Sequence, residues 1–133
     1  MASIAQKQRI NVSANMVAAG LRAFFEIKKK WGLTNDQAMV LLGAPPKSTY
    51  FKWQGGNPPR TGPLLDLATR LSYVLGIFKA LEILYQQSDL ADKWISKPNL
   101  AFGGESALDR MMGGQITDLA EVREYLDSVR GGW

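Results

Sequence analysis

Four carboxylates recur every three residues near the C-terminus, where such groups could perform acid–base chemistry. They are Asp118, Glu121, Glu124 and Asp127. Acid–base catalysis needs two carboxyl groups aimed into one pocket. A spacing of three on a helix instead places all four on one side, opposite the apolar residues. We therefore interpret them as a solvated helix face, on which Arg123 and Asp127 can form an ion pair one turn apart.

Two glycine pairs just upstream could form a loop that cradles phosphate. They are Gly103–Gly104 and Gly113–Gly114. A phosphate loop leads from a strand into a helix and continues into a Gly-Lys-Ser/Thr sequence, which this chain does not contain. Glycine is also the residue that ends helices in a left-handed conformation. We expect these glycines to separate short helices, and we expect no bound nucleotide or other cofactor.

The chain contains neither histidine nor cysteine. The commonest zinc ligands, histidine-dependent nucleophiles and disulfides are therefore excluded. The sequence predicts a protein that is not an enzyme. An enzyme that relies on carboxylates alone is the weak alternative.

The net charge of +4 conceals an uneven distribution. Residues 1–60 hold nine Lys or Arg and two Asp or Glu, a net of +7, whereas residues 61–133 hold seven and ten, a net of −3. A basic half joined to an acidic half indicates two different partners, one of them a polyanion. The other interpretation is chance clustering of solvated charges.

The chain shows no signal-peptide pattern and no apolar run of the roughly 20 residues that a membrane span requires. Its longest apolar run is Leu71–Phe78. We expect a cytoplasmic protein that does not contact a membrane.

Apolar spacing and capping signals predict an all-α fold. Thr34 with Gln37, Ser106 with Asp109, and Asp118 with Glu121 each have the spacing of a capping box. Ser88 or Asp89 could cap another short helix. About seven helices are expected, over residues 13–31, 35–42, 46–54, 64–87, 89–95, 107–112 and 119–129.

Two of these helices form a helix-turn-helix motif. Gly43 can end the first, and Pro46 can stand in the first turn of the second. In the second helix, Tyr50 and Trp53 can face the core. The residues that would face DNA are basic or carry hydroxyl groups, which suit a major groove, and Arg60 would contact phosphate. This predicted DNA-binding set is Lys47, Ser48, Thr49, Lys52 and Arg60.

The predicted helix over 64–87 is apolar around most of its circumference. Such a helix is buried or forms an oligomer interface. A core between two halves and a dimer surface are both open interpretations.

The last residues, Arg130–Trp133, combine two types that often anchor protein interfaces, Arg and Trp, with a flexible Gly-Gly between them. Either this tail reaches into a cleft of a partner, or Trp133 folds back onto its own core.

The segment from Trp94 to Trp133 resembles the C-terminal toxin-binding region of the MbcA/ParS/Xre antitoxins, and "LLGAPPKSTYFKW" resembles their Xre-type helix-turn-helix. Ala107 stands where many relatives carry proline, and the second proline of "APP" differs from the usual turn. The residues that match the family pattern in the C-terminal segment are Trp94, Pro98, Asn99, Phe102, Gly104, Ala107, Leu108, Asp109, Met111, Gly114, Arg130, Gly131, Gly132 and Trp133.

This resemblance implies a type II antitoxin. Residues 1–62 would form the helix-turn-helix region, residues 63–87 a central helix that connects the two parts or forms a dimer, and residues 88–133 the toxin-binding domain. The partners would be a cognate RES-domain toxin that degrades NAD, operator DNA, and further copies in a homodimer or a larger toxin–antitoxin complex. A stand-alone Xre-type regulator whose C-terminal half dimerises or senses a ligand is the alternative. The residues expected to contact the toxin are Arg123, Asp127, Arg130, Gly131, Gly132 and Trp133.

Overall fold

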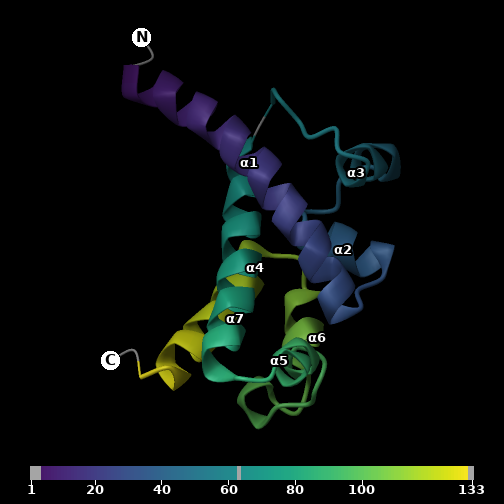
Figure 1. The fold of residues 1–133 in the computed structure, drawn as a ribbon, viewed down its shortest axis with the longest axis vertical. Coiled ribbons are helices and arrows are strands. Elements are labelled where there is room, and N and C mark those ends of the chain that lie inside the picture. Colours follow the sequence, from purple (N-terminus) through teal and green to yellow (C-terminus); the bar gives the residue numbers. More distant parts are fainter. Residues whose placement is uncertain (1–3, 63, 132–133) are drawn as a thin grey trace.

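The computed structural model describes the backbone of residues 4–62 and 64–131, with side chains from residue 14 onward. In these ranges it has seven α-helices, one short 3-10 helix (η1) and no strand, which confirms the all-α prediction (Figure 1). None of the helices described is both long and apolar enough to cross a membrane. The elements in chain order are α1 (Ile4–Trp31), α2 (Asn35–Leu41), α3 (Lys47–Gln54), α4 (Leu64–Leu84), α5 (Ser88–Trp94), η1 (Leu100–Phe102), α6 (Ala107–Met111) and α7 (Ile116–Val129).

The core forms around α4, which α1 crosses on one side and α7 contacts on another (Figure 1). A Cβ on Gly20 of α1 would lie 3.1 Å from Leu71 Cδ1, so the glycine allows α1 and α4 to approach closely. At the far end of α1, the Trp31 and Phe78 rings are 6.2 Å apart. The apolar residues of α4 are therefore largely buried within the chain itself, although Leu65 and Ile83 remain exposed.

The helix-turn-helix follows α1 directly. Thr34 and Gln37 form the predicted capping box of α2. Gly43 then adopts the expected positive φ, at 92°, and Ala44 follows with a φ of 57°. Pro46 is the N-cap of α3 rather than a residue of its first turn. The predicted end of α3 at Gln54 is confirmed.

Of the C-terminal helices, α5 and α7 pack against α4, and α6 packs against α7 (Figure 1). Ser106 and Asp109 form the predicted capping box of α6. An aromatic cluster joins α5 and η1 to α7. The Trp94 ring of α5 stacks on Tyr125 at 6.3 Å, and Phe102 of η1 meets the same ring edge-on at 5.3 Å.

Several predicted helix boundaries are wrong. The first helix begins at Ile4 rather than near residue 13, because polar residues precede its buried face and hide its start from apolar periodicity. The helix over 64–87 ends at Leu84, and the N-cap of α5 is Gln87 rather than Ser88 or Asp89.

The predicted start of α7 is also wrong. The N-cap is Gln115, and Asp118 is the third residue of the helix, where its carboxylate accepts a hydrogen bond from Gln115 N at 3.0 Å. Gly114, at a φ of 82°, turns the chain into this cap. Asp118 therefore completes a capping box with a residue before it, not with Glu121.

Candidate interaction surfaces

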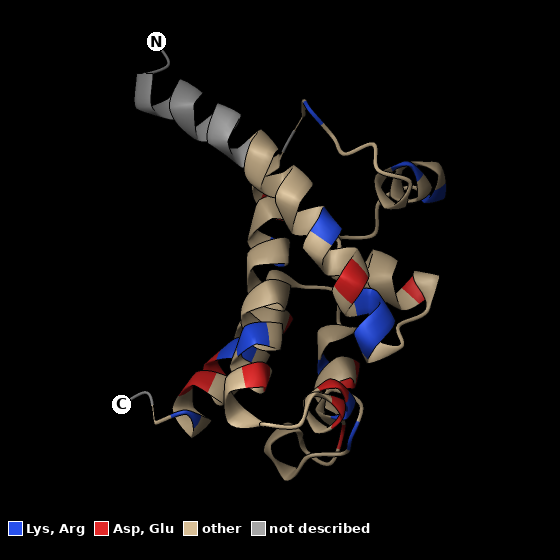
Figure 2. Ribbon diagram, viewed as in Figure 1, with Lys and Arg blue, Asp and Glu red and all other residues tan. Residues whose placement is uncertain are grey.

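The α3 face consists of Lys47, Ser48, Thr49 and Lys52. Thr49 is half-buried and the other three are exposed. Within the described part of the chain, none of the four makes an ion pair or a side-chain hydrogen bond. Figure 2 shows α3 with positive charges and no carboxylate, whereas the C-terminal helices carry both signs. The structure thus brings together four of the five residues predicted to contact DNA.

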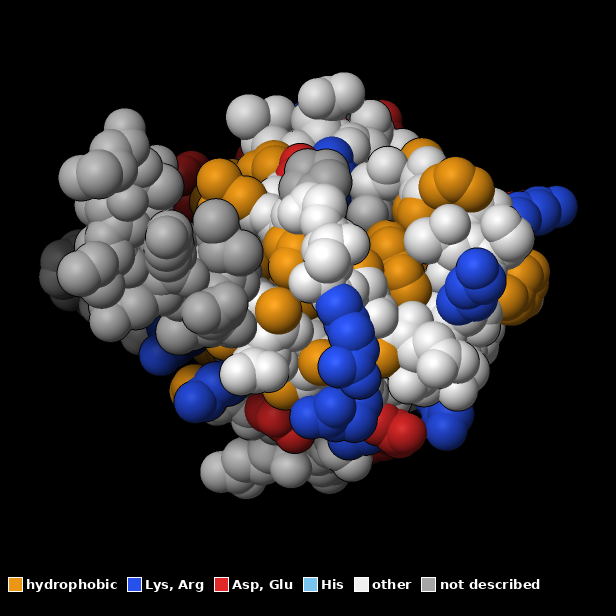
Figure 3. Space-filling view, turned by 90° about the horizontal axis from the view of Figure 1, so that it is seen from above, with side chains coloured by type: hydrophobic (Ala, Val, Ile, Leu, Met, Phe, Trp, Pro, Cys, Tyr) orange, Lys and Arg blue, Asp and Glu red, His pale blue; other side chains and the backbone are white. Residues whose placement is uncertain are grey.

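Arg60, the fifth, lies in the loop between α3 and α4 rather than on the α3 face. It is exposed and makes no ion pair within the described residues. Figure 3, a view from above, shows Lys and Arg side chains at the centre of this face and projecting from its right side.

The opposite side of α3 is anchored by Tyr50, which is fully buried. Its hydroxyl donates a hydrogen bond to Asn35 Oδ1 at 3.0 Å, and its ring meets Phe25 of α1 edge-on at 5.7 Å. Burial raises the pKa of the Tyr50 hydroxyl, which keeps it protonated as the donor. Tyr50 therefore fixes which side of α3 points to solvent.

Trp53, the second residue predicted to face the core, is half-buried between two hollows. One, of about 680 Å³, lies between α1 and the end of α3, and the other, of about 350 Å³, lies between α3 and the start of α4. Figure 1 shows that α3 stands out from the body formed by α1 and α4.

The turn before α3 lies against an ion pair of α4. Arg70 Nε donates to Asp66 Oδ2 at 2.9 Å. A Cβ on Gly43 would stand 3.0 Å from Arg70 Nε and 3.2 Å from Asp66 Oδ2. The helix-turn-helix is therefore held by α4 at its turn as well as by Tyr50.

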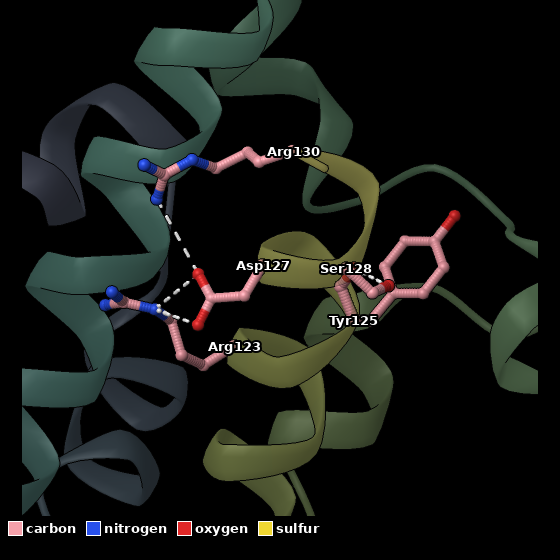
Figure 4. Close-up of polar contacts among 5 residues, drawn as sticks. All are labelled: Arg123, Tyr125, Asp127, Ser128 and Arg130. Carbon is pink, nitrogen blue, oxygen red and sulfur yellow. Dashed lines mark hydrogen bonds and ion pairs between the residues drawn. The ribbon is translucent and has the colours of Figure 1, made fainter. Parts of the chain in front are cut away.

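The second surface is the α7 network, formed by Arg123, Asp127 and Arg130 (Figure 4). Arg123 Nε donates to both Asp127 carboxylate oxygens at 3.1 Å. Arg130 Nη1 lies 3.6 Å from Asp127 Oδ1. The predicted Arg123–Asp127 pair is confirmed, and one carboxylate serves two arginines, both of which extend toward α4 in Figure 4.

The four acids predicted to form a solvated face do reach solvent, but three of them also have partners. Asp118 caps α7, and Glu121 accepts hydrogen bonds from Arg110 at 3.1 and 3.2 Å. Asp127 holds the α7 network. The partners of Asp118 and Glu121 lie in the cap and on α6, which spacing along one helix does not reveal, whereas those of Asp127 lie on α7 itself.

The tail predicted to contact the toxin is described only in part. Gly131 adopts a φ of 86°, and its N–H donates to Ser128 O at 3.2 Å. Gly132 and Trp133 lie outside the described residues. The two interpretations of Trp133 therefore stay as predictions.

Sequence reasoning missed the surroundings of the α7 network. Arg123 and Asp127 line an open cleft of about 570 Å³ together with Met16 of α1 and residues of α4, including Leu65 and Tyr73. Arg123 also lies against Gly76 of α4. A glycine inside an apolar helix was a signal that could have indicated a close approach.

Comparison with known proteins identifies the family of the chain. A model for the antitoxin Xre-like helix-turn-helix domain matches residues 12–76, and one for the antitoxin Xre/MbcA/ParS C-terminal toxin-binding domain matches residues 80–132. An uncharacterized protein, y4oB, of Sinorhizobium fredii is 48% identical over 118 residues, which are 87% of this chain and 88% of that protein. The chain belongs to the Xre/MbcA/ParS antitoxins.

This Xre-type antitoxin is therefore a toxin binder and regulator rather than an enzyme. Its α3 face lies in the helix-turn-helix match, and its α7 network lies in the toxin-binding match. Both matched ranges include part of α4, so one helix contributes to both domains.

Proposed function

We propose that this antitoxin neutralises a RES-domain toxin that depletes NAD, and that it does so by covering the toxin's active site with the end of α7. In this proposal it acts in the cytoplasm as the antitoxin of a type II module. The observation that carries the proposal is the α7 network inside the matched toxin-binding domain. Arginine held by a carboxylate keeps a fixed geometry, which favours specific recognition at an interface.

Co-expression with the protein encoded by the neighbouring open reading frame tests the toxin assignment. Growth rescue, restored cellular NAD and co-purification of the two proteins are the expected results. A control variant that lacks Arg130–Trp133 should lose most of the rescue while it still folds. Unchanged NAD depletion in the presence of the full-length antitoxin would overturn the assignment.

We further propose that the α3 face binds operator DNA in the antitoxin's own promoter. The support is an outward row of Lys and hydroxyl side chains on a protruding helix. A gel shift with the promoter fragment, compared with an unrelated fragment of equal length, tests this role. Equal affinity for both fragments would contradict operator recognition.

We also propose that the chain is divided by function into residues 1–62, 63–87 and 88–133. The proposed assembly is a homodimer or a larger complex with the toxin.

A further inference from the structure

Gly76 occupies the middle of α4 and faces the guanidinium of Arg123. A Cβ at this position would overlap Arg123 Nη1 and lie 2.8 Å from its Cζ. The next nearest atom is Nε of the same side chain, at 3.6 Å. The three nearest atoms to the absent side chain therefore all belong to one guanidinium group.

A glycine within a helix is less favourable than alanine, because its backbone loses more conformational freedom on folding. Gly76 stands in helical conformation between Leu75 and Ile77, so no left-handed turn requires it. The close approach of Arg123 is the feature of the structure that a larger residue would remove.

The position of Arg123 determines the rest of the α7 network. Its Nε holds both oxygens of Asp127, and Asp127 in turn attracts Arg130, the first residue of the tail. The guanidinium Nη atoms point away from Asp127 toward α4 in Figure 4. They border the cleft that Met16, Leu65 and Tyr73 line.

We propose that Gly76 is a positioning residue for toxin binding: its missing side chain forms the recess that sets the direction of Arg123 and, through Asp127, of Arg130. This inference rests on the proposed toxin-binding role of the α7 network. In this proposal α4 affects toxin binding only indirectly, because Gly76 positions Arg123.

The test is Gly76→Ala. Alanine favours the helix, and the atoms it displaces are the end of a flexible side chain, so we expect the melting temperature to be unchanged or higher. The Kd for the purified RES-domain toxin should nevertheless rise about tenfold, the effect of losing one well-placed anchor. A G76A protein with unchanged toxin affinity would overturn the inference.

A double-mutant cycle separates positioning from a general packing role. If Gly76 acts through Arg123, G76A should cause no further loss of affinity in an Arg123→Ala background. Additive losses would contradict the relay. If R123A alone leaves toxin affinity unchanged, the proposed role of Arg123 fails instead.

A readout in the free antitoxin tests the positioning of Arg123 without the toxin. The Nε–H resonance of Arg123 in a ¹⁵N NMR spectrum should shift and lose protection from exchange in G76A, because its bond to Asp127 is redirected. Gly20→Ala is the matched control, since its Cβ would meet Leu71 rather than a charged group. An Arg123 resonance that is identical in G76A and the parent would overturn the inference.

Discussion

Two regions of this antitoxin share an arrangement, in which a glycine lies against the arginine of an i,i+4 ion pair between Asp and Arg. In the helix-turn-helix, Gly43 faces Arg70, whose side chain is only 11% exposed. In the toxin-binding part, Gly76 faces Arg123, whose side chain is 32% exposed. The same components therefore occur once inside the fold and once at its surface.

The difference in exposure distinguishes a structural role for Arg70 from the proposed recognition role of Arg123. Because Arg70 is enclosed, its contact with the turn is internal. Its Nη1 has no hydrogen-bond partner among the described residues. Arg123 shares Asp127 with Arg130 and borders an open cleft. An enclosed arginine can orient the chain, whereas a half-exposed arginine that is held in place can also meet a partner.

The comparison predicts opposite outcomes for alanine at the two glycines, and Gly43→Ala has the largest expected effect on stability. Alanine at a φ of 92° is strained, and its Cβ would stand 3.0 Å from the enclosed Arg70. We expect a loss of about 2–3 kcal/mol in the free energy of unfolding. Urea denaturation measures it, and a loss no greater than that of G76A would show that the two glycines are equivalent.

Asp127→Ala should release both arginines of the α7 network. We expect the toxin Kd to rise about 30-fold, equivalent to about 2 kcal/mol, because the complex would bury two cations without their acceptor. The pair is partly exposed, so the free energy of unfolding should change by less than about 1 kcal/mol. Calorimetric titration with toxin measures the affinity, and operator binding should be unchanged. A smaller effect than that of the nearby, exposed E124A would contradict the role of the network.

The α3 face should respond to salt in a way that the α7 network does not. Replacing Lys47 and Lys52 by alanine should weaken operator binding about tenfold and reduce the slope of log K against log salt by about 2. Gel shifts at several salt concentrations measure both quantities. K93A/K97A is the matched control, because it removes the same charge from exposed positions near α5. Equal effects of the two double variants would indicate non-specific attraction.

Glu121→Ala has the smallest expected effect and sharpens the comparison within α7. It removes the acceptor of Arg110, a pair whose side chains are 33% and 46% exposed. We expect less than about 1 kcal/mol of lost stability and no change in toxin affinity. If E121A weakened toxin binding as much as D127A, ion pairs along α7 would matter collectively rather than through Asp127.

The features that could be predicted from the sequence are those set by residues close together along the chain. The capping boxes of Thr34 and Ser106 and the left-handed turn at Gly43 follow from local backbone chemistry, and all three are confirmed. The start of α7 was wrong because two overlapping capping patterns share Asp118, and the position of Gly114 selects the earlier one.

Contacts between distant segments could not be predicted in the same way. Arg110 and Glu121 lie on different helices, and Gly76 meets Arg123 only because α7 packs on α4. Periodicity along one helix identifies which side of that helix is apolar, but it does not say which glycine on another helix that side will meet. The partners of the acids on α7 were therefore missed, although the Arg123–Asp127 pair within the helix was found.

The continuous helix α4 has a consequence for how this antitoxin is removed from a cell. It packs on α1, holds the turn before α3 and contacts α7, so neither surface has an independent core. Proteases act mainly on chains that have opened, and segments that share a core open together. We expect degradation that begins by opening α4 to abolish the proposed operator binding and the proposed toxin neutralisation at the same moment, leaving no fragment that performs one task alone.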